Sequence, residues 1–173
     1  MSHLGSSQWW WNTAFDGIAS SLVTAAIAIV GVVAALKHDR DLAEEIAFRQ
    51  ECTSLSRTAR VLDHEFGAAE KGGGGWTMVH HQMVEFAADL TNFAAARTEK
   101  EPNLARIIDA AAHVILDNFW GPDRDIGKLD AGIETVRATL ANRVRMPKHL
   151  QKMPVEQVDT LVEGVHAGHP VSA

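Results

Sequence analysis

The chain has 173 residues, of which 22 are acidic and 16 are lysine or arginine, so its formal net charge is −6. Nucleic-acid-binding domains normally carry a basic face, and this excess of acid argues against a nucleic-acid partner. The only cysteine, Cys52, excludes an intrachain disulfide and is compatible with a reducing compartment.

Residues 18–36 form an apolar run without a single charged side chain. A helix of this length rises about 1.5 Å per residue and just spans a hydrocarbon core of roughly 30 Å. The tryptophans Trp9, Trp10 and Trp11 lie upstream, and tryptophan is enriched where lipid meets water. The run therefore predicts a single transmembrane helix. A buried helix of a soluble protein would show a polar stripe, and a signal peptide would start with basic residues.

The flanks of this helix predict its orientation. Residues 1–17 contain no lysine or arginine, whereas Lys37 and Arg40 follow the apolar run. Because basic residues stay on the cytoplasmic side, we expect residues 1–17 to be a short extracytoplasmic tail carrying the tryptophans. Residues 37–173 are then cytoplasmic. The expected location is the inner (plasma) membrane, with membrane lipid as one partner and a single crossing of the bilayer.

One face of the expected transmembrane helix consists of small residues at helical spacing. Small residues let two helix backbones approach closely in lipid, so this face is a candidate for self-association. An alanine-rich segment can also produce such a stripe by chance. The face comprises Gly17, Ser20, Thr24, Ala28, Gly31 and Ala35.

The cytoplasmic part should be helical, because its apolar residues recur at steps of three and four and strand patterns are nearly absent. Its first helix is expected over residues 39–66 and carries a heptad-like seam. The seam could form a coiled coil with a second copy or pack against later helices of the same chain, and we favour the second because those helices are nearby. The seam comprises Phe48, Cys52, Leu55, Ala59, Leu62 and Phe66.

Glycines and prolines divide the remaining sequence into further helices. Four glycines at residues 72–75 predict a hinge, and they lack the Lys-Ser/Thr pair of a phosphate-binding loop. Helices are expected over residues 76–97, 102–120 and 125–144, with Asp123 as a candidate N-cap. The last segment, residues 147–173, should contain a short helix over 155–165 and a flexible tail. The predicted fold is all-α: one transmembrane helix and a cytoplasmic domain over residues 37–146, a bundle of about four helices.

Histidines and acids suggest one candidate metal site. His81 and Glu85 lie on one expected helix, and His113 and Asp117 lie on the next, so a divalent metal bound between them could support a membrane-tethered hydrolase. Their helical positions lie away from the apolar faces, which favours solvent exposure instead. No HExxH motif is present, and Cys52 belongs to an apolar seam where thiols are inert. We therefore expect no catalytic residue, resident metal or cofactor.

A basic cluster follows the last long helix and could hold the domain against an anionic membrane, or could be an ordinary charged helix end. It comprises Arg137, Arg143, Arg145, Lys148, His149 and Lys152. Taken together, the sequence predicts a non-enzymatic interaction or assembly module whose partner is another protein or a second copy. The metal-dependent hydrolase is the alternative.

Overall fold

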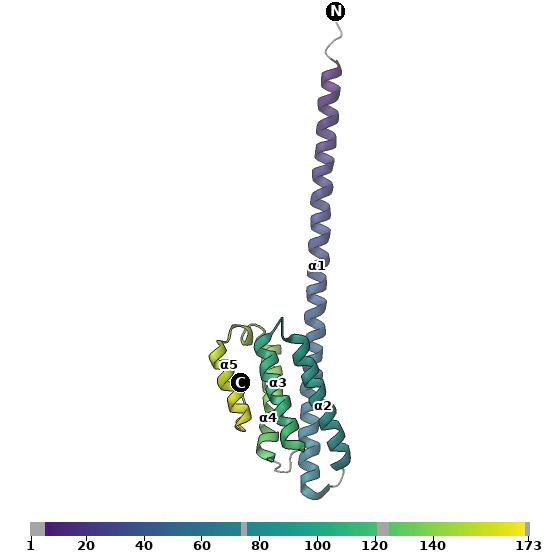
Figure 1. The fold of residues 1–173 in the computed structure, drawn as a ribbon. Coiled ribbons are helices and arrows are strands. Elements are labelled where there is room, and N and C mark those ends of the chain that lie inside the picture. The colour runs from purple at the N-terminus through teal and green to yellow at the C-terminus, as the bar shows by residue number, and fades with distance from the viewer. Residues whose placement is uncertain (1–5, 74–75, 121–124, 172–173) are drawn as a thin grey trace, which may run out of the picture. The chain divides into compact units, whose positions relative to one another are not determined.

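The structure is a computed structural model that describes residues 6–73, 76–120 and 125–171, with only the backbone described for residues 6–20, 70, 73, 76 and 120. The described residues form helices and turns without a strand, and the predicted all-α class is confirmed. Five α-helices are present (Figure 1): α1 (Ser6–Ala68), α2 (Trp76–Arg97), α3 (Pro102–Trp120), α4 (Ile126–Arg145) and α5 (Val155–His166). A π-helical turn η1 (Ala69–Gly73) and a 3-10 turn η2 (Leu150–Lys152) complete them.

The chain divides into two compact units, Met1–Ala47 and Phe48–Ala173. In the first unit, every described side chain from residue 21 to residue 44 is exposed. Eight large apolar side chains are each at least 59% exposed: Leu22, Val23, Ile27, Ile29, Val30, Val32, Val33 and Leu36. Among the described residues, this is the one helical stretch both long and apolar enough to cross a membrane.

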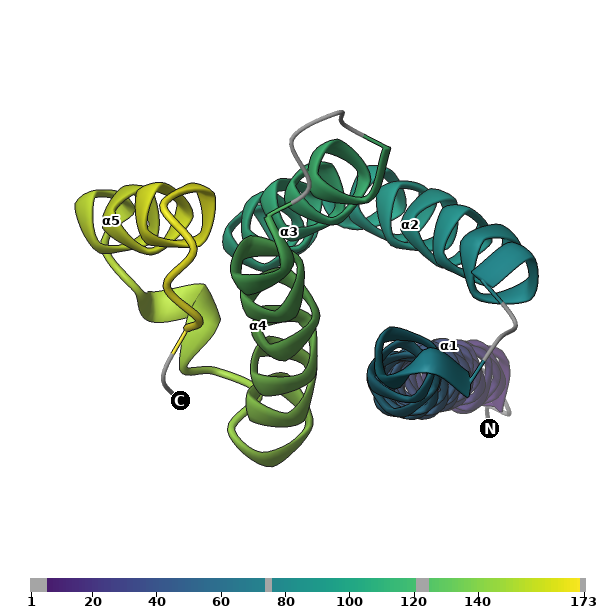
Figure 2. The same cartoon turned by 90° about the horizontal axis from the view of Figure 1, so that it is seen from below.

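The second unit is built around α3, which packs against α2, α4 and α5 (Figure 2). The face of α3 toward its neighbours is apolar, with Ile107, Ile108 and Ile115 fully buried. Gly132 of α4 lies so close to α3 that an added Cβ would be 3.0 Å from Cγ1 of Ile115. The missing side chain therefore allows the two helices to approach closely.

The seam of α1 packs inside the second unit. Four of its residues, Phe48, Cys52, Ala59 and Leu62, are at most 3% exposed, while Leu55 and Phe66 are partly buried against the same core. The ring of Phe48 stacks on that of Phe93 in α2, with centroids 5.8 Å apart and planes 10° from parallel. In this structure the seam packs against later helices of the same chain, which is the favoured one of the two predicted arrangements.

The helices end close to the positions predicted from the glycines and prolines in the sequence. The turn after α1 places Gly72 at φ 90°, a left-handed conformation that side chains other than glycine rarely adopt. The remaining hinge residues 74–75 lie outside the described residues, as does the expected turn at 121–124 with Asp123. The N-cap of α4 is Asp125, whose Oδ1 accepts a hydrogen bond from the backbone N of Lys128 at 3.1 Å.

The segment after α4 is tied to the core by side-chain contacts. Asn103 of α3 donates hydrogen bonds to the carbonyl oxygens of Leu150 at 2.8 Å and Met153 at 3.0 Å. Beyond α5, the backbone N of Val171 donates to Oγ1 of Thr135 in α4 at 3.2 Å. The chain thus returns to α4 at its described end, and the mobility expected of this tail stays a prediction.

Candidate functional site

The small-residue face expected to support self-association is only partly described. The side chains of Thr24, Ala28 and Ala35 are exposed, and a Cβ added at Gly31 would meet no atom within 4 Å. The side chains of Gly17, Ser20 and the tryptophans Trp9, Trp10 and Trp11 lie outside the description. Self-association through this face stays a prediction.

The two acid–histidine pairs considered for metal binding each stay within their own helix. Nε2 of His81 lies 3.2 Å from Oε1 of Glu85, and both side chains are mostly exposed. His113 turns its Nδ1 to the carbonyl oxygen of Asp109 at 2.9 Å, while Asp117 is exposed. Among the described residues, no group of three or more histidine, cysteine, aspartate or glutamate side chains converges in a metal-binding arrangement. The hydrolase alternative gains no supporting observation.

A buried ion pair joins the turn between α2 and α3 to α4. Nε and Nη2 of Arg143 each donate to one carboxylate oxygen of Glu101 at 2.7 Å, so the pair is bidentate. Its side chains are only 4% and 8% exposed. Bidentate geometry at this distance is the strongest form of the arginine–carboxylate interaction, and burial removes the water that would weaken it.

The same arginine contacts α1. The guanidinium carbon of Arg143 lies 4.6 Å from the ring centroid of Phe48, and the guanidinium carbon of Arg97 lies 4.3 Å from the same centroid. Arg97 also forms an ion pair with Glu51, at 3.0 Å. These cation–π contacts and ion pairs connect the start of the second unit to α2 and α4. The two arginines therefore stabilise the packing of these helices.

Two of the six residues of the basic cluster are engaged within the domain, so they are not free to contact a membrane. Arg143 is 3% exposed and engaged with Glu101, because it lies on the inward face of α4. Arg137 is paired with Glu134 at 2.7 Å and with Asp63 of α1 at 3.6 Å. The other four residues of the cluster are exposed to solvent: Arg145, Lys148, His149 and Lys152.

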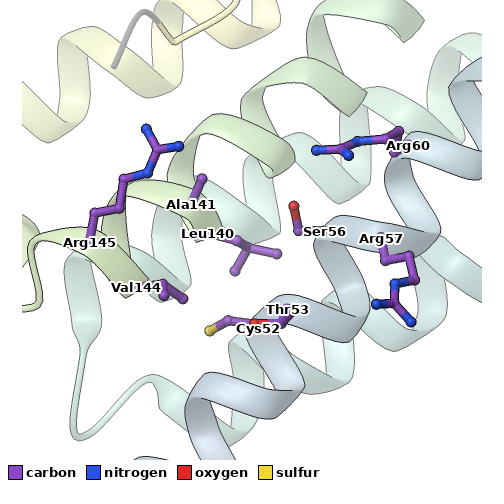
Figure 3. Close-up of a pocket in the computed structure, with 9 residues that line it drawn as sticks. All are labelled: Cys52, Thr53, Ser56, Arg57, Arg60, Leu140, Ala141, Val144 and Arg145. Atoms are coloured by element: carbon purple, nitrogen blue, oxygen red, sulfur yellow. The ribbon is translucent and has the colours of Figure 1, made fainter.

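A groove lies between residues 52–60 of α1 and residues 140–145 of α4 (Figure 3), with a volume of about 310 Å³. Its apolar lining is formed by Cys52, Leu140, Ala141 and Val144. Its polar lining is formed by Thr53, Ser56, Arg57, Arg60 and Arg145. In Figure 3 the side chain of Arg60 extends from α1 toward α4. The groove therefore combines an apolar floor with a cationic rim, and we call it the arginine groove.

The thiol of Cys52 does not make this groove a nucleophilic site. Burial raises the pKa of Cys52 to about 12, an effect that the nearby charges of Arg143 and Arg97 oppose only in part. The thiol is consequently protonated at neutral pH, and a thiolate is the form that attacks. Cys52 serves as an apolar packing residue.

Of the groove arginines, only Arg145 was part of a cluster predicted from the sequence, whereas Arg57 and Arg60 were not predicted. The signal that could have found these two is their position beside the seam, since Arg57 lies two residues after Leu55 and Arg60 follows Ala59. Such positions flank a helix interface and remain open to solvent on one side. Comparison with known proteins adds nothing to this geometry, because no protein-family model, curated protein or solved structure matches the chain.

Proposed function

We propose that the chain is a single-pass membrane protein whose helical domain acts as a non-enzymatic interaction module. The observation that supports this proposal is the exposed apolar stretch of α1, with eight large apolar side chains at least 59% exposed. Each leucine, isoleucine or valine favours insertion by about 0.3–0.6 kcal/mol, or roughly 2–5 kcal/mol for the eight together. The partner is another protein or a second copy, the N-terminus is extracytoplasmic and the helical domain is cytoplasmic.

Membrane insertion is tested by fractionating cells that express the full chain. The wild type should resist extraction by alkaline carbonate, whereas Ile27→Arg combined with Val30→Arg should be released. Each central arginine costs about 2.5–3.5 kcal/mol and together they outweigh the favourable sum. Ile27→Leu with Val30→Leu is the matched control and should stay in the membrane. Release of the wild type, or an intact mass lacking the apolar stretch, would refute a membrane span.

The orientation is tested with protease added to sealed membrane vesicles of each sidedness. The helical domain, Phe48–Ala173, should be digested in inside-out vesicles and protected in right-side-out vesicles. This expectation follows from Lys37 and Arg40 after the apolar stretch. Protection of the domain in inside-out vesicles would reverse the proposed orientation.

Self-association through the small-residue face is tested by enlarging its residues. Ala28→Leu with Gly31→Leu should lower the cross-linked dimer fraction, because leucine side chains prevent close backbone approach in lipid. Ala26→Leu with Val33→Leu enlarges the opposite face of the helix and should leave that fraction unchanged. Equal cross-linking of both double variants would remove this face from the proposal and leave a different protein as the partner.

A further inference from the structure

Several arginines of the second unit form ion pairs within it. A carboxylate oxygen lies within 4.0 Å of each of Arg97, Arg106, Arg137 and Arg143. The exposed arginines of the groove are Arg57, Arg60 and Arg145. Among the described residues, no carboxylate forms an ion pair with any of them. In a chain with 22 acidic and 16 lysine or arginine side chains, three groove arginines without an ion pair among the described residues are unexpected. Such a group produces a local positive potential that attracts anions.

The chemistry of the rim suits an oxyanion such as phosphate. A guanidinium presents its donors in a planar fork that matches two oxygens of a phosphate, and several guanidiniums together match a doubly charged phosphomonoester. Ser56 lines the same groove and can donate its hydroxyl hydrogen. The hydroxyl of Thr53 donates to the carbonyl oxygen of Arg49 at 2.7 Å, so its oxygen remains available as an acceptor.

The floor of the groove adds an apolar requirement. Cys52 and Leu140 are fully buried beneath it, while Ala141 and Val144 are half-buried at its wall. Its volume of about 310 Å³ is at the lower end of the range for small-molecule sites, and an isolated phosphate ion would leave the apolar lining uncovered. A ligand that contacts both surfaces carries a small organic group next to its phosphate.

We propose that the arginine groove between α1 and α4 binds the phosphate group of a small phosphomonoester, with the guanidinium groups of Arg60 and Arg145 as its anchors beside the apolar lining. Two sources share this chemistry: a free phosphorylated metabolite and the headgroup of a phosphatidic-acid-like lipid. The proposal does not require the chain to cross a membrane, because a free phosphomonoester would reach the groove in either case.

The test uses the full chain in an uncharged detergent and two probes at constant ionic strength. Inorganic phosphate is titrated calorimetrically against a sodium chloride reference, and short-chain phosphatidic acid in mixed micelles is compared with short-chain phosphatidylcholine. Both phosphate and phosphatidic acid should bind if the ligand is free, and phosphatidic acid alone if the apolar chains are needed. Phosphatidylcholine should not bind. Absence of binding by both anionic probes would overturn the proposal.

Variants show whether binding occurs in the groove. Arg60→Gln and Arg145→Gln should each weaken binding about tenfold or more, since each removes charge-assisted hydrogen bonds. Lys152→Gln removes the same charge from an exposed position outside the groove and should change the affinity less than about twofold. Equal weakening by all three variants would indicate only a general charge effect and would overturn the assigned site.

A neutral substitution separates the groove from its charge. Ala141→Phe fills the groove from its apolar wall while every arginine remains, so binding should be lost if the ligand enters the groove. The melting temperature of each variant without ligand, followed by circular dichroism, verifies that it is folded. If a folded Ala141→Phe variant binds both anionic probes as tightly as the wild type, the ligand lies elsewhere.

Discussion

The buried ion pair between Glu101 and Arg143 gives the sharpest test of the packing. Replacing Glu101 with glutamine keeps the shape of the side chain and removes its charge. The guanidinium of Arg143 then stays in a position where its side chain is 4% exposed, without the two 2.7 Å bonds to a carboxylate. Solvent cannot replace the lost counter-charge unless the helices separate.

The expected loss is large because one charge is left unpaired. Removing one partner of a buried pair costs about 3–5 kcal/mol, whereas replacing both partners by apolar groups is often close to neutral. The ring of Phe48, 4.6 Å from the guanidinium carbon, compensates only partly, since a cation–π contact contributes up to about 2 kcal/mol and is already present. For a domain of this size, Glu101→Gln should lower the melting temperature by roughly 10–20 °C.

The assay is thermal unfolding of the full chain in detergent, followed by circular dichroism. A double-mutant cycle with Arg143→Met completes the test, because methionine occupies the same space without a charge. The double variant Glu101→Gln/Arg143→Met should melt above Glu101→Gln alone. Combined with the single variant Arg143→Met, the cycle should give a coupling energy of about 2 kcal/mol or more. If Glu101→Gln melts within about 3 °C of the wild type, the pair is solvated in solution and the reasoning is wrong.

Three further expectations concern single sites. Partial desolvation, together with the charge and hydrogen bond of Asp63, raises the pKa of the largely exposed Asp130, so the folded state holds this proton more tightly than the unfolded state. Asp130→Asn should therefore raise the melting temperature at neutral pH, and the gain should disappear in acid, where Asp130 is protonated in both states. Because burial raises the pKa of Cys52 to about 12, alkylation at pH near 8 should require denaturant, and rapid labelling of the native protein would contradict its position. Gly132→Val should lower the free energy of unfolding by about 1–3 kcal/mol, because the added atoms meet α3. Gly67→Ala, where no atom lies within 4 Å of the added Cβ, should raise it by about 0.4–1 kcal/mol. Equal melting temperatures of the two variants would refute the close approach of α4 to α3.

The helix positions were predictable because local chemistry determines them. Pro102 begins α3 as the sequence predicts, since proline suits a first helical turn, and Gly72 ends the helical region of α1 with a positive φ. The expected helices 76–97 and 102–120 match α2 and α3 at both ends. The fourth begins at Ile126 because the capping carboxylate belongs to Asp125. All of these signals act within a few residues.

The pairing of Glu101 with Arg143 was not predictable in the same way, because 42 residues separate them. A partial signal did exist in the spacing of Leu129, Ile133, Val136 and Leu140, whose next member at the same period is Arg143. An arginine in the apolar register of a helix requires a buried acid, yet the sequence pattern does not identify which one. The basic cluster was defined by proximity along the sequence, which does not show that Arg143 lies on the buried face of α4.

The groove arginines differ from Arg143, because we expect them to contribute little to the stability of the fold. Arg57, Arg60 and Arg145 are exposed and form no ion pair with the acidic side chains that the structure describes. Replacing one of them with glutamine should therefore change the free energy of unfolding by no more than about 0.5 kcal/mol. Glu101→Gln, by contrast, should destabilise the domain strongly. A melting temperature of Arg60→Gln or Arg145→Gln well below that of the wild type would mean that these side chains hold α1 to α4. An unchanged melting temperature with weakened phosphate binding would separate function from stability in this bundle.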